Sequence, residues 1–402
     1  MRRHGTLAVL SILAVALTVS MVAFPDLAFA SAVKGLRVWW DVVFPALLPF
    51  FIAGQILMAL GVVNFMGVLM EPFMRPLFNV PGVGAFVVAM GLASGYPIGS
   101  VLTAKLRREG QLSRGEAERL MSFTNTADPL FMAGAVAVGM FKSAALGGII
   151  MAAHYLGALA TGLVLRFYKK EDRTPPPPRD ARRQGRVARA FSEMVAAHRR
   201  DGRPFGQVLG DSVRDSIQTL LLVGGFIILF SVIIQVLTQI GAVAWITSAL
   251  SLVLSPFGIH RQAIGSLVSG FFEITIGSQA AAQAPVALLE RVMLASAIIA
   301  WSGLSVMAQV AAVTQGTGVS MVPYVFSRLI HGVFAAVIAV LLWNPGAALP
   351  ALATSAQGQV ATAPLLPDFW RMLAGSTALL AVMVALCAVL TTLAIWRERL
   401  MA

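Results

Sequence analysis

Long apolar runs recur along the whole chain, and most of them reach the length of about 20 residues that a helix needs to cross a bilayer. Hydrophobic residues make up 58% of the 402 residues, and charged residues only 12%. A water-soluble domain carries about twice that share of charge, because its surface faces water. We therefore expect an all-α polytopic membrane protein whose first partner is the lipid bilayer.

Eight transmembrane helices and two re-entrant hairpins account for the apolar sequence. The spans are expected over residues 7–24, 43–63, 113–141, 143–167, 217–240, 289–313, 321–343 and 369–396, and the hairpins over 81–106 and 261–283. Residues 64–80 and 242–256 are typical of interfacial helices, because they are too short or too interrupted to span.

These segments divide the chain into five parts. We expect an N-terminal anchor helix and external segment over 1–40, a first repeat over 41–168, a basic cytoplasmic linker over 169–213, a second repeat over 214–345, and an external loop with a C-terminal transmembrane helix over 346–402. Ala28-Phe29-Ala30 resembles a signal-peptidase site, but the apolar run before it is longer than a usual signal core. Its length favours a retained anchor over a cleaved signal.

Basic residues gather in the segments expected to face the cytoplasm. Between Arg166 and Arg214, 13 Lys and Arg residues stand against 6 Asp and Glu residues. The positive-inside rule explains this charge without a nucleic-acid partner. We therefore expect a multi-pass protein of the cell (inner) membrane with both termini in the cytoplasm. Within the linker, residues 182–200 form either a basic amphipathic helix on the membrane or a solvated tether.

Two interruptions of the apolar sequence fall where a membrane helix reaches mid-depth. The first hairpin breaks over residues 94–100, and the following helix, which starts at a Ser113–Glu116 capping box, breaks over 125–129. Pro129 removes a backbone donor and disfavours helix at Asp128, so this break has a local cause. Irregular backbone at this depth is tolerated only inside protein or beside water.

A second copy of this pattern follows. Ser94-Gly95-Tyr96 matches Ser269-Gly270-Phe271, the Glu118-Arg119 pair matches Glu290-Arg291, and residues 300–303 are the expected second helix break. The exit loop of the first hairpin, 105–119, holds five basic residues, whereas the matching loop, 279–291, holds one. The two copies are therefore expected to be inverted repeats, the usual basis of alternating access in secondary transporters.

The breaks supply the candidate substrate-binding residues: Ser94, Gly95, Tyr96, Ser100, Asn125, Thr126, Asp128, Glu273, Thr275, Ser278, Trp301, Ser302 and Ser305. Asp128 and Glu273 are costly to place in a membrane, so they either contact substrate or a coupling ion, or they cap helix ends. Tyr96 and Trp301 either stack on a flat ring or pack in the core. No Arg or Lys is expected near the breaks, so an anionic solute would either depend on helix dipoles or enter partly protonated.

Two classes of function remain open from these residues. One is a secondary transporter for a small polar aromatic or heterocyclic solute, coupled to H⁺ or Na⁺. The other is a non-transporting membrane scaffold that binds partners through the basic linker. We expect no enzyme, cofactor or metal, because the sequence has no catalytic or ligand constellation.

Several of these motifs occur together in one family of membrane proteins. Gly95-Tyr96-Pro97-Ile98-Gly99, the helix start at Glu116 and the Pro129-Leu130-Phe131 segment resemble the YlbJ-type sporulation integral membrane proteins, which carry nucleoside-recognition (Gate) domains. The order of elements is similar to that of concentrative nucleoside transporters. The resemblance implies export of dipicolinic acid during sporulation, in the cell membrane or the outer forespore membrane, and a homotrimer. A permease for nucleosides or another small metabolite, or a scaffold for spore assembly, is the alternative.

Overall fold

The computed structural model describes residues 2–174, 186–254 and 261–343, and these residues form helices and connecting turns without a strand. The first repeat holds α3 (Phe44–Ala59), α4 (Val62–Phe78), α5 (Gly84–Ser94), α6 (Ile98–Arg108), α7 (Arg114–Thr124), η2 (Leu130–Met140) and α8 (Ala145–Leu165). The second repeat holds α10 (Phe205–Gln239), α11 (Ala242–Leu254), α12 (Arg261–Phe272), α13 (Ile274–Gln283), α14 (Leu288–Trp301), α15 (Gly303–Val313) and α16 (Met321–Leu341). The two lists have the same order of elements, as the sequence predicts.

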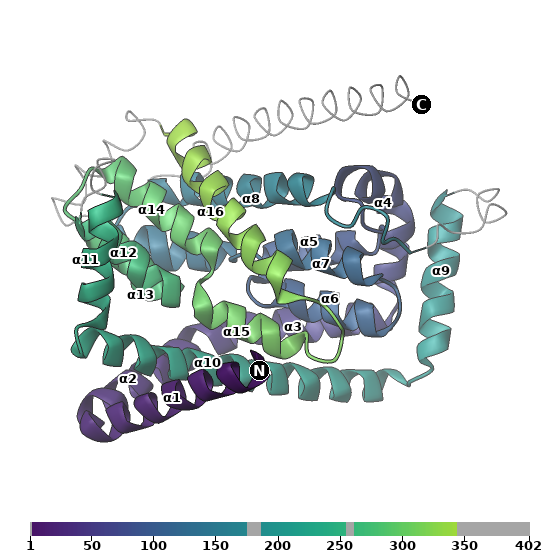
Figure 1. Ribbon diagram of the computed structural model, residues 1–402. Coiled ribbons are helices and arrows are strands. Elements are labelled where there is room, and N and C mark those ends of the chain that lie inside the picture. Colours follow the sequence, from purple (N-terminus) through teal and green to yellow (C-terminus); the bar gives the residue numbers. More distant parts are fainter. Residues whose placement is uncertain (1, 175–185, 255–260, 344–402) are drawn as a thin grey trace.

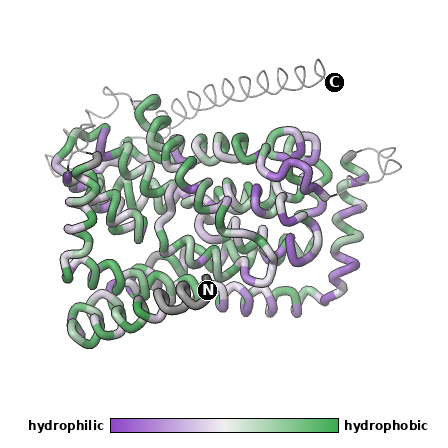
Figure 2. Tube along the Cα trace, viewed as in Figure 1, coloured by the Kyte–Doolittle hydropathy of each residue, from purple (hydrophilic) through white to green (hydrophobic). Residues whose placement is uncertain are grey.

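The second helix of the first repeat, α4, and the second helix of the second repeat, α11, lie at opposite ends of the bundle. Figure 1 shows α4 at the right end and α11 at the left end. Repeats in the same orientation would place both helices at one end, so the arrangement is inverted. Figure 2 shows hydrophilic residues gathered at the end that holds α4, α9 (Arg186–Asp201) and the start of α10. The basic loops from which the sequence predicts a cytoplasmic face lie at this polar end.

Helix α9 is docked on the bundle and is not a solvated tether. It runs across the direction of α10 at the polar end (Figure 1). A Cβ placed on Gly61 would lie 2.3 Å from the Met194 carbonyl oxygen, and His198 Nδ1 is 3.2 Å from the Ala59 carbonyl oxygen. Glycine at position 61, with a φ of +78°, therefore lets α9 approach the α3–α4 turn.

Fewer spans are visible than the eight expected. Four helices among the described residues are long and apolar enough to cross a membrane, and the number rises to six if two bent pairs each count as one span. The first broken helix is missing from that count, because its pieces α7 and η2 have 11 residues each. The predicted external loop and final helix, 346–402, lie outside the described residues.

Three segments differ in detail from the expectation. Residues expected in an external segment form α2 (Pro25–Val38), which starts with proline at its first position and packs closely on α10, because Gly35 has no side chain there. Helix α10 begins at Phe205, inside the predicted linker. The second half of the first broken helix is a π-helix, η2, and not a continued α-helix.

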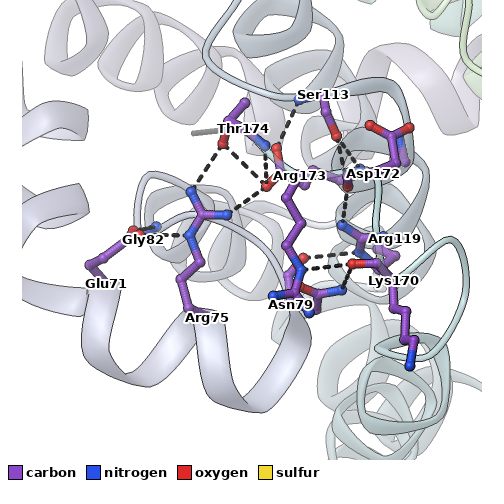
Figure 3. A network of polar contacts seen from close by, with 12 residues as sticks. Glu71, Arg75, Asn79, Gly82, Ser113, Arg119, Lys170, Asp172, Arg173 and Thr174 are labelled. Carbon is purple, nitrogen blue, oxygen red and sulfur yellow. Dashed lines mark hydrogen bonds and ion pairs between the residues drawn. The ribbon is translucent and has the colours of Figure 1, made fainter. Parts of the chain in front are cut away.

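Polar contacts anchor the first broken helix at the polar end (Figure 3). Ser113 and Glu116 form the predicted capping box at the start of α7. Arg75 of α4 donates to Glu71 at 2.6 Å and to Glu116 at 2.9 Å. Arg119, almost fully buried, donates to four backbone carbonyl oxygens, those of Asn79, Tyr168, Lys169 and Asp172. Helices α4 and α7 and the loop after α8 are therefore held as one unit.

Candidate functional site

The tip of the first hairpin touches the first helix break. Between α5 and α6 the chain turns at Gly95, whose φ is +77°. A Cβ on Gly95 would lie 2.7 Å from Asp128 Oδ2, in the non-helical stretch between α7 and η2. Thr126 Oγ1 donates to the Gly91 carbonyl oxygen at 3.0 Å. Glycine at position 95 is thus required for the tip to reach the break.

The second repeat has the same pairing. Helices α12 and α13 meet at Glu273, which is extended, and α14 and α15 meet at Ser302, whose φ is +71°. A Cβ on Gly303 would lie 3.0 Å from the Phe272 carbonyl oxygen and 3.2 Å from Glu273 Cα. The break falls within the predicted residues 300–303. The hairpin turn is narrower than the predicted tip, because Ile274–Gln283 is already helical.

Side chains of the two repeats meet between these breaks. The Tyr96 hydroxyl donates to the Ile299 carbonyl oxygen of α14 at 2.9 Å. Asn125 Nδ2 donates to the Tyr324 hydroxyl of α16 at 2.6 Å. Tyr96 and Trp301 also pack against the same apolar cluster, which includes Tyr324. The first hairpin tip and the second broken helix therefore share one centre.

Both candidate acids cap helix ends. Asp128 Oδ1 accepts the Phe131 N–H at 2.8 Å, and Glu273 Oε2 accepts the Ile276 N–H at 2.8 Å. Each carboxylate therefore stabilises the N-terminus of a half-helix, where backbone donors lack partners. Both side chains remain partly exposed. A role in binding substrate or a coupling ion stays a prediction beside this capping role.

Polar atoms without a hydrogen-bond partner gather at the breaks. Within the described ranges the unpartnered buried atoms at predicted site residues are Ser94 Oγ, Ser100 Oγ, Asn125 Oδ1, Ser278 Oγ and Ser302 Oγ. Buried polar groups are normally paired, so unpaired groups that gather at one place mark a candidate binding site. The breaks thus present several hydrogen-bonding groups that the protein itself does not satisfy.

The remaining predicted residues lie around the second break. Trp301 Nε1 donates to the Phe271 carbonyl oxygen at 3.1 Å, and the two rings stack with centroids 5.4 Å apart. Both line a groove of about 680 Å³ between α12, α14 and α16. Ser305 is buried in the first turn of α15, and Thr275 is partly buried in the first turn of α13.

Three buried residues of α8 and α16, the last helix of each repeat, were not among the predicted site residues. His154 Nε2 accepts the Ala127 N–H at 3.0 Å, and His331 Nε2 bonds to the His154 carbonyl oxygen at 2.8 Å. Arg328 of α16 donates to the carbonyl oxygens of Ser122 and Asn125 at the end of α7. The expectation that no Arg or Lys lies near the breaks is therefore wrong. A lone arginine in the apolar run 321–341 was the available signal.

Charged groups outside the spans form a separate cluster at the polar end. The hydrogen bond to the Glu118 carboxylate raises the pKa of Lys169 above its usual range. The hydrogen bond from Arg203 holds the pKa of Asp201 below its usual range. Among the described residues no group of His, Cys, Asp or Glu is arranged to hold a metal ion.

Comparison with known proteins places this architecture in a family. Residues 40–163 and 220–356 match the family described as nucleoside recognition (Gate). The sporulation integral membrane protein YlbJ of Bacillus subtilis (strain 168) is 48% identical over 340 residues, which are 82% of this chain and 81% of that protein.

Two solved structures of CNTnw also match, both at 14% sequence identity. One, in an inward-facing substrate-bound state, has a TM-score of 0.35 and covers 81% of this chain and 84% of its own. The other, a substituted form in an outward-facing state, has a TM-score of 0.33 and covers 81% and 86%. On the strength of the family match and the YlbJ relative, this chain belongs to the nucleoside-recognition (Gate) family of membrane proteins, in its YlbJ-type sporulation branch.

Proposed function

We propose that this protein is a secondary transporter that moves a small polar aromatic or heterocyclic solute by alternating access. The observation that carries the proposal is the meeting of two hairpin tips with two helix breaks. Each tip touches its own break, at Gly95–Asp128 and at Glu273–Gly303, and the unpartnered serine and asparagine atoms lie at the same places. A polar centre formed by two inverted repeats is the arrangement that binds solutes in many transporters.

The aromatic side chains support a flat solute. Trp301 and Phe271 are stacked on the wall of the groove of about 680 Å³, which is large enough for a small heterocycle. Residues that pack in this way bury much apolar area and favour offset stacking with a ring. With the sporulation relative, this supports dipicolinate, exported toward the developing spore, as the solute. Coupling to H⁺ or Na⁺ and a homotrimeric assembly belong to the same proposal.

Flux into proteoliposomes tests the function and the two acids. Asp128→Asn keeps an oxygen that can cap η2, and Glu273→Gln keeps one that can cap α13, so both variants remove charge while preserving the caps. We expect dipicolinate flux to fall about 10- to 100-fold in either variant, the value of a lost charged contact to the coupling H⁺ or Na⁺. Glu171→Gln, an exposed acid on the cytoplasmic loop, is the control and should transport like the wild type. Wild-type flux in both acid variants would reduce these residues to helix caps.

A nucleoside permease is the second candidate, favoured by the description of the matching family. The same vesicles loaded with uridine or adenosine separate the two solutes. Saturable nucleoside flux without dipicolinate flux would replace the solute and keep the transport mechanism.

A membrane scaffold is the rival from another class, and the exposed apolar residues of α9 favour it. Val187 and Phe191 lie one turn apart and are 65% and 57% exposed. We expect the double change Val187→Ser and Phe191→Ser to leave flux unchanged. If the double change abolishes sporulation while Asp128→Asn and Glu273→Gln leave sporulation unchanged, the scaffold is correct.

A further inference from the structure

We propose that Arg328 is the residue that selects a carboxylate-bearing solute, an inference that rests on the proposed transport function. It stands two turns into α16, the helix that begins at Met321. Its side chain is fully buried. Its place in the fold is the first helix break, where the second repeat reaches across to the end of α7.

Arg328 is only partly neutralised by the protein. Two of its nitrogens donate to the Ser122 and Asn125 carbonyl oxygens at the C-terminal end of α7. A helix C-terminus carries the equivalent of about half a negative charge, so roughly half of the guanidinium charge is left without compensation. The guanidinium also lies over the Tyr324 ring, 5.1 Å from its centroid, which adds a weaker attraction.

No ion pair of the described ranges completes the neutralisation. The salt bridges formed by the described residues do not include Arg328, and neither Asp128 nor Glu273 pairs with it. Its Nε is buried without a hydrogen-bond acceptor. An incompletely paired charge in a membrane is costly and is retained where it has a function. The unpartnered Nε and a residual positive charge form a site for an anion.

The surroundings specify the anion further. Arg328 lines the same groove of about 680 Å³ as Phe271 and Trp301; the groove also includes Glu290, and its other lining residues are apolar. An anion that fits must therefore carry an apolar or aromatic body beside its charge. A carboxylate on a small ring meets these requirements better than a neutral nucleoside.

A ligand series on the purified wild-type protein gives the first test. Dipicolinate, picolinate and picolinamide share one ring and differ in charge, and uridine represents a neutral nucleoside. We expect picolinate to bind about 10- to 100-fold more tightly than picolinamide, the value of a hydrogen bond to a charged group. Equal affinities for picolinate and picolinamide would overturn the role of Arg328, whatever happens in the variants.

Variants separate charge selection from the structural role of Arg328 at the end of α7. In Arg328→Gln the picolinate-to-picolinamide affinity ratio should fall to near one, and in Arg328→Lys it should be partly retained. A purely structural loss would weaken both ligands alike and leave their ratio unchanged, which would contradict the proposal. Arg108→Gln is the matched control, because Arg108 also donates to backbone carbonyl oxygens but lies exposed at the polar end. Its ratio should equal that of the wild type.

The outcome for the transport function is independent of this ratio. Saturable flux of uridine or picolinamide, without preference for carboxylates, would reject the selection by Arg328 and keep the transporter. The absence of flux for every solute in the series, from a folded wild-type protein, would reject the transporter itself. If Arg328→Gln does not fold, the wild-type series and Arg328→Lys still decide between these results.

Discussion

Equivalent positions of the two repeats are held very differently. Glu118 and Arg119 stand at the start of the first broken helix, and Glu290 and Arg291 stand at the start of the second. Glu118 accepts hydrogen bonds from Arg114, Tyr168, Lys169 and the Ser320 backbone, and Arg119 donates to four carbonyl oxygens. Arg291, by contrast, is only partly buried, donates to the Ala282 carbonyl oxygen, lies over the Phe141 ring and leaves Nε unpartnered in the described part of the chain.

The two ends of the molecule differ in the polar contacts that join the repeats. At the polar end the network ties both repeats together, because Glu118 of the first repeat holds the backbone of Ser320, the N-cap of α16. Arg107 and Arg108 add donors to the loop after α15. At the opposite end, Arg291 contacts the first repeat through the Phe141 ring. Separating the repeats at Arg291 would therefore break a ring contact, whereas separating them at the polar end would break hydrogen bonds of Glu118, Arg107 and Arg108.

The largest expected effect is the loss of Arg119. Arg119→Ala leaves four carbonyl oxygens without their donor, at about 1 kcal/mol each, so we expect a destabilisation of about 4 kcal/mol. Arg291→Ala removes one hydrogen bond and one cation–π contact and should cost about 1 kcal/mol. The Tm of the detergent-purified variants measures both. Equal losses at the two positions would break the comparison between the repeats.

The next effect concerns the glycines that bring each tip to its break. Gly95→Ala places a methyl group against Asp128 and strains a positive φ, for a cost of about 3 kcal/mol. Gly303→Ala has more room and should cost less than Gly95→Ala. Gly110→Ala is the matched control, because its φ is also positive and nothing lies close to its Cβ position. Only the backbone strain of about 1 kcal/mol then remains. The order of the three Tm values is the measurement, and a reversed order would refute the packing argument.

The smallest loss of stability is expected from removing the charge of Glu118. Glu118→Gln keeps the shape of the side chain, and the two cations that it loses are partly exposed, so we expect a cost of about 1 kcal/mol at pH 7. The hydrogen bond to Glu118 raises the pKa of Lys169, and this contribution is present below the unfolded pKa of Lys and lost as the pH rises through the folded value. The difference in Tm between wild type and Glu118→Gln should therefore shrink above about pH 10.4. A difference that grows with pH would contradict the pairing.

The sequence by itself determined the features that depend on near neighbours. Pro129 ends the helix before it, Ser113 and Glu116 start α7, and Gly95 permits the tip. The recurrence of this pattern, with its charge asymmetry, was enough to predict inverted repeats and the position of both breaks. Hydropathy predicted the helices, because a membrane helix forms its backbone hydrogen bonds within itself and needs about 20 consecutive apolar residues to cross the bilayer.

Only the tertiary structure decided what meets at the centre. Arg328 reaches Asn125 across 203 positions of sequence, and Tyr96 reaches Ile299 across the same separation, so no local pattern announces either contact. The docking of α2 and α9 likewise depends on partners far away in the chain. Long-range packing also gives Arg328 no salt-bridge partner among the residues that the structure describes, because neutralisation depends on which groups the fold brings together, and the order of residues does not specify that.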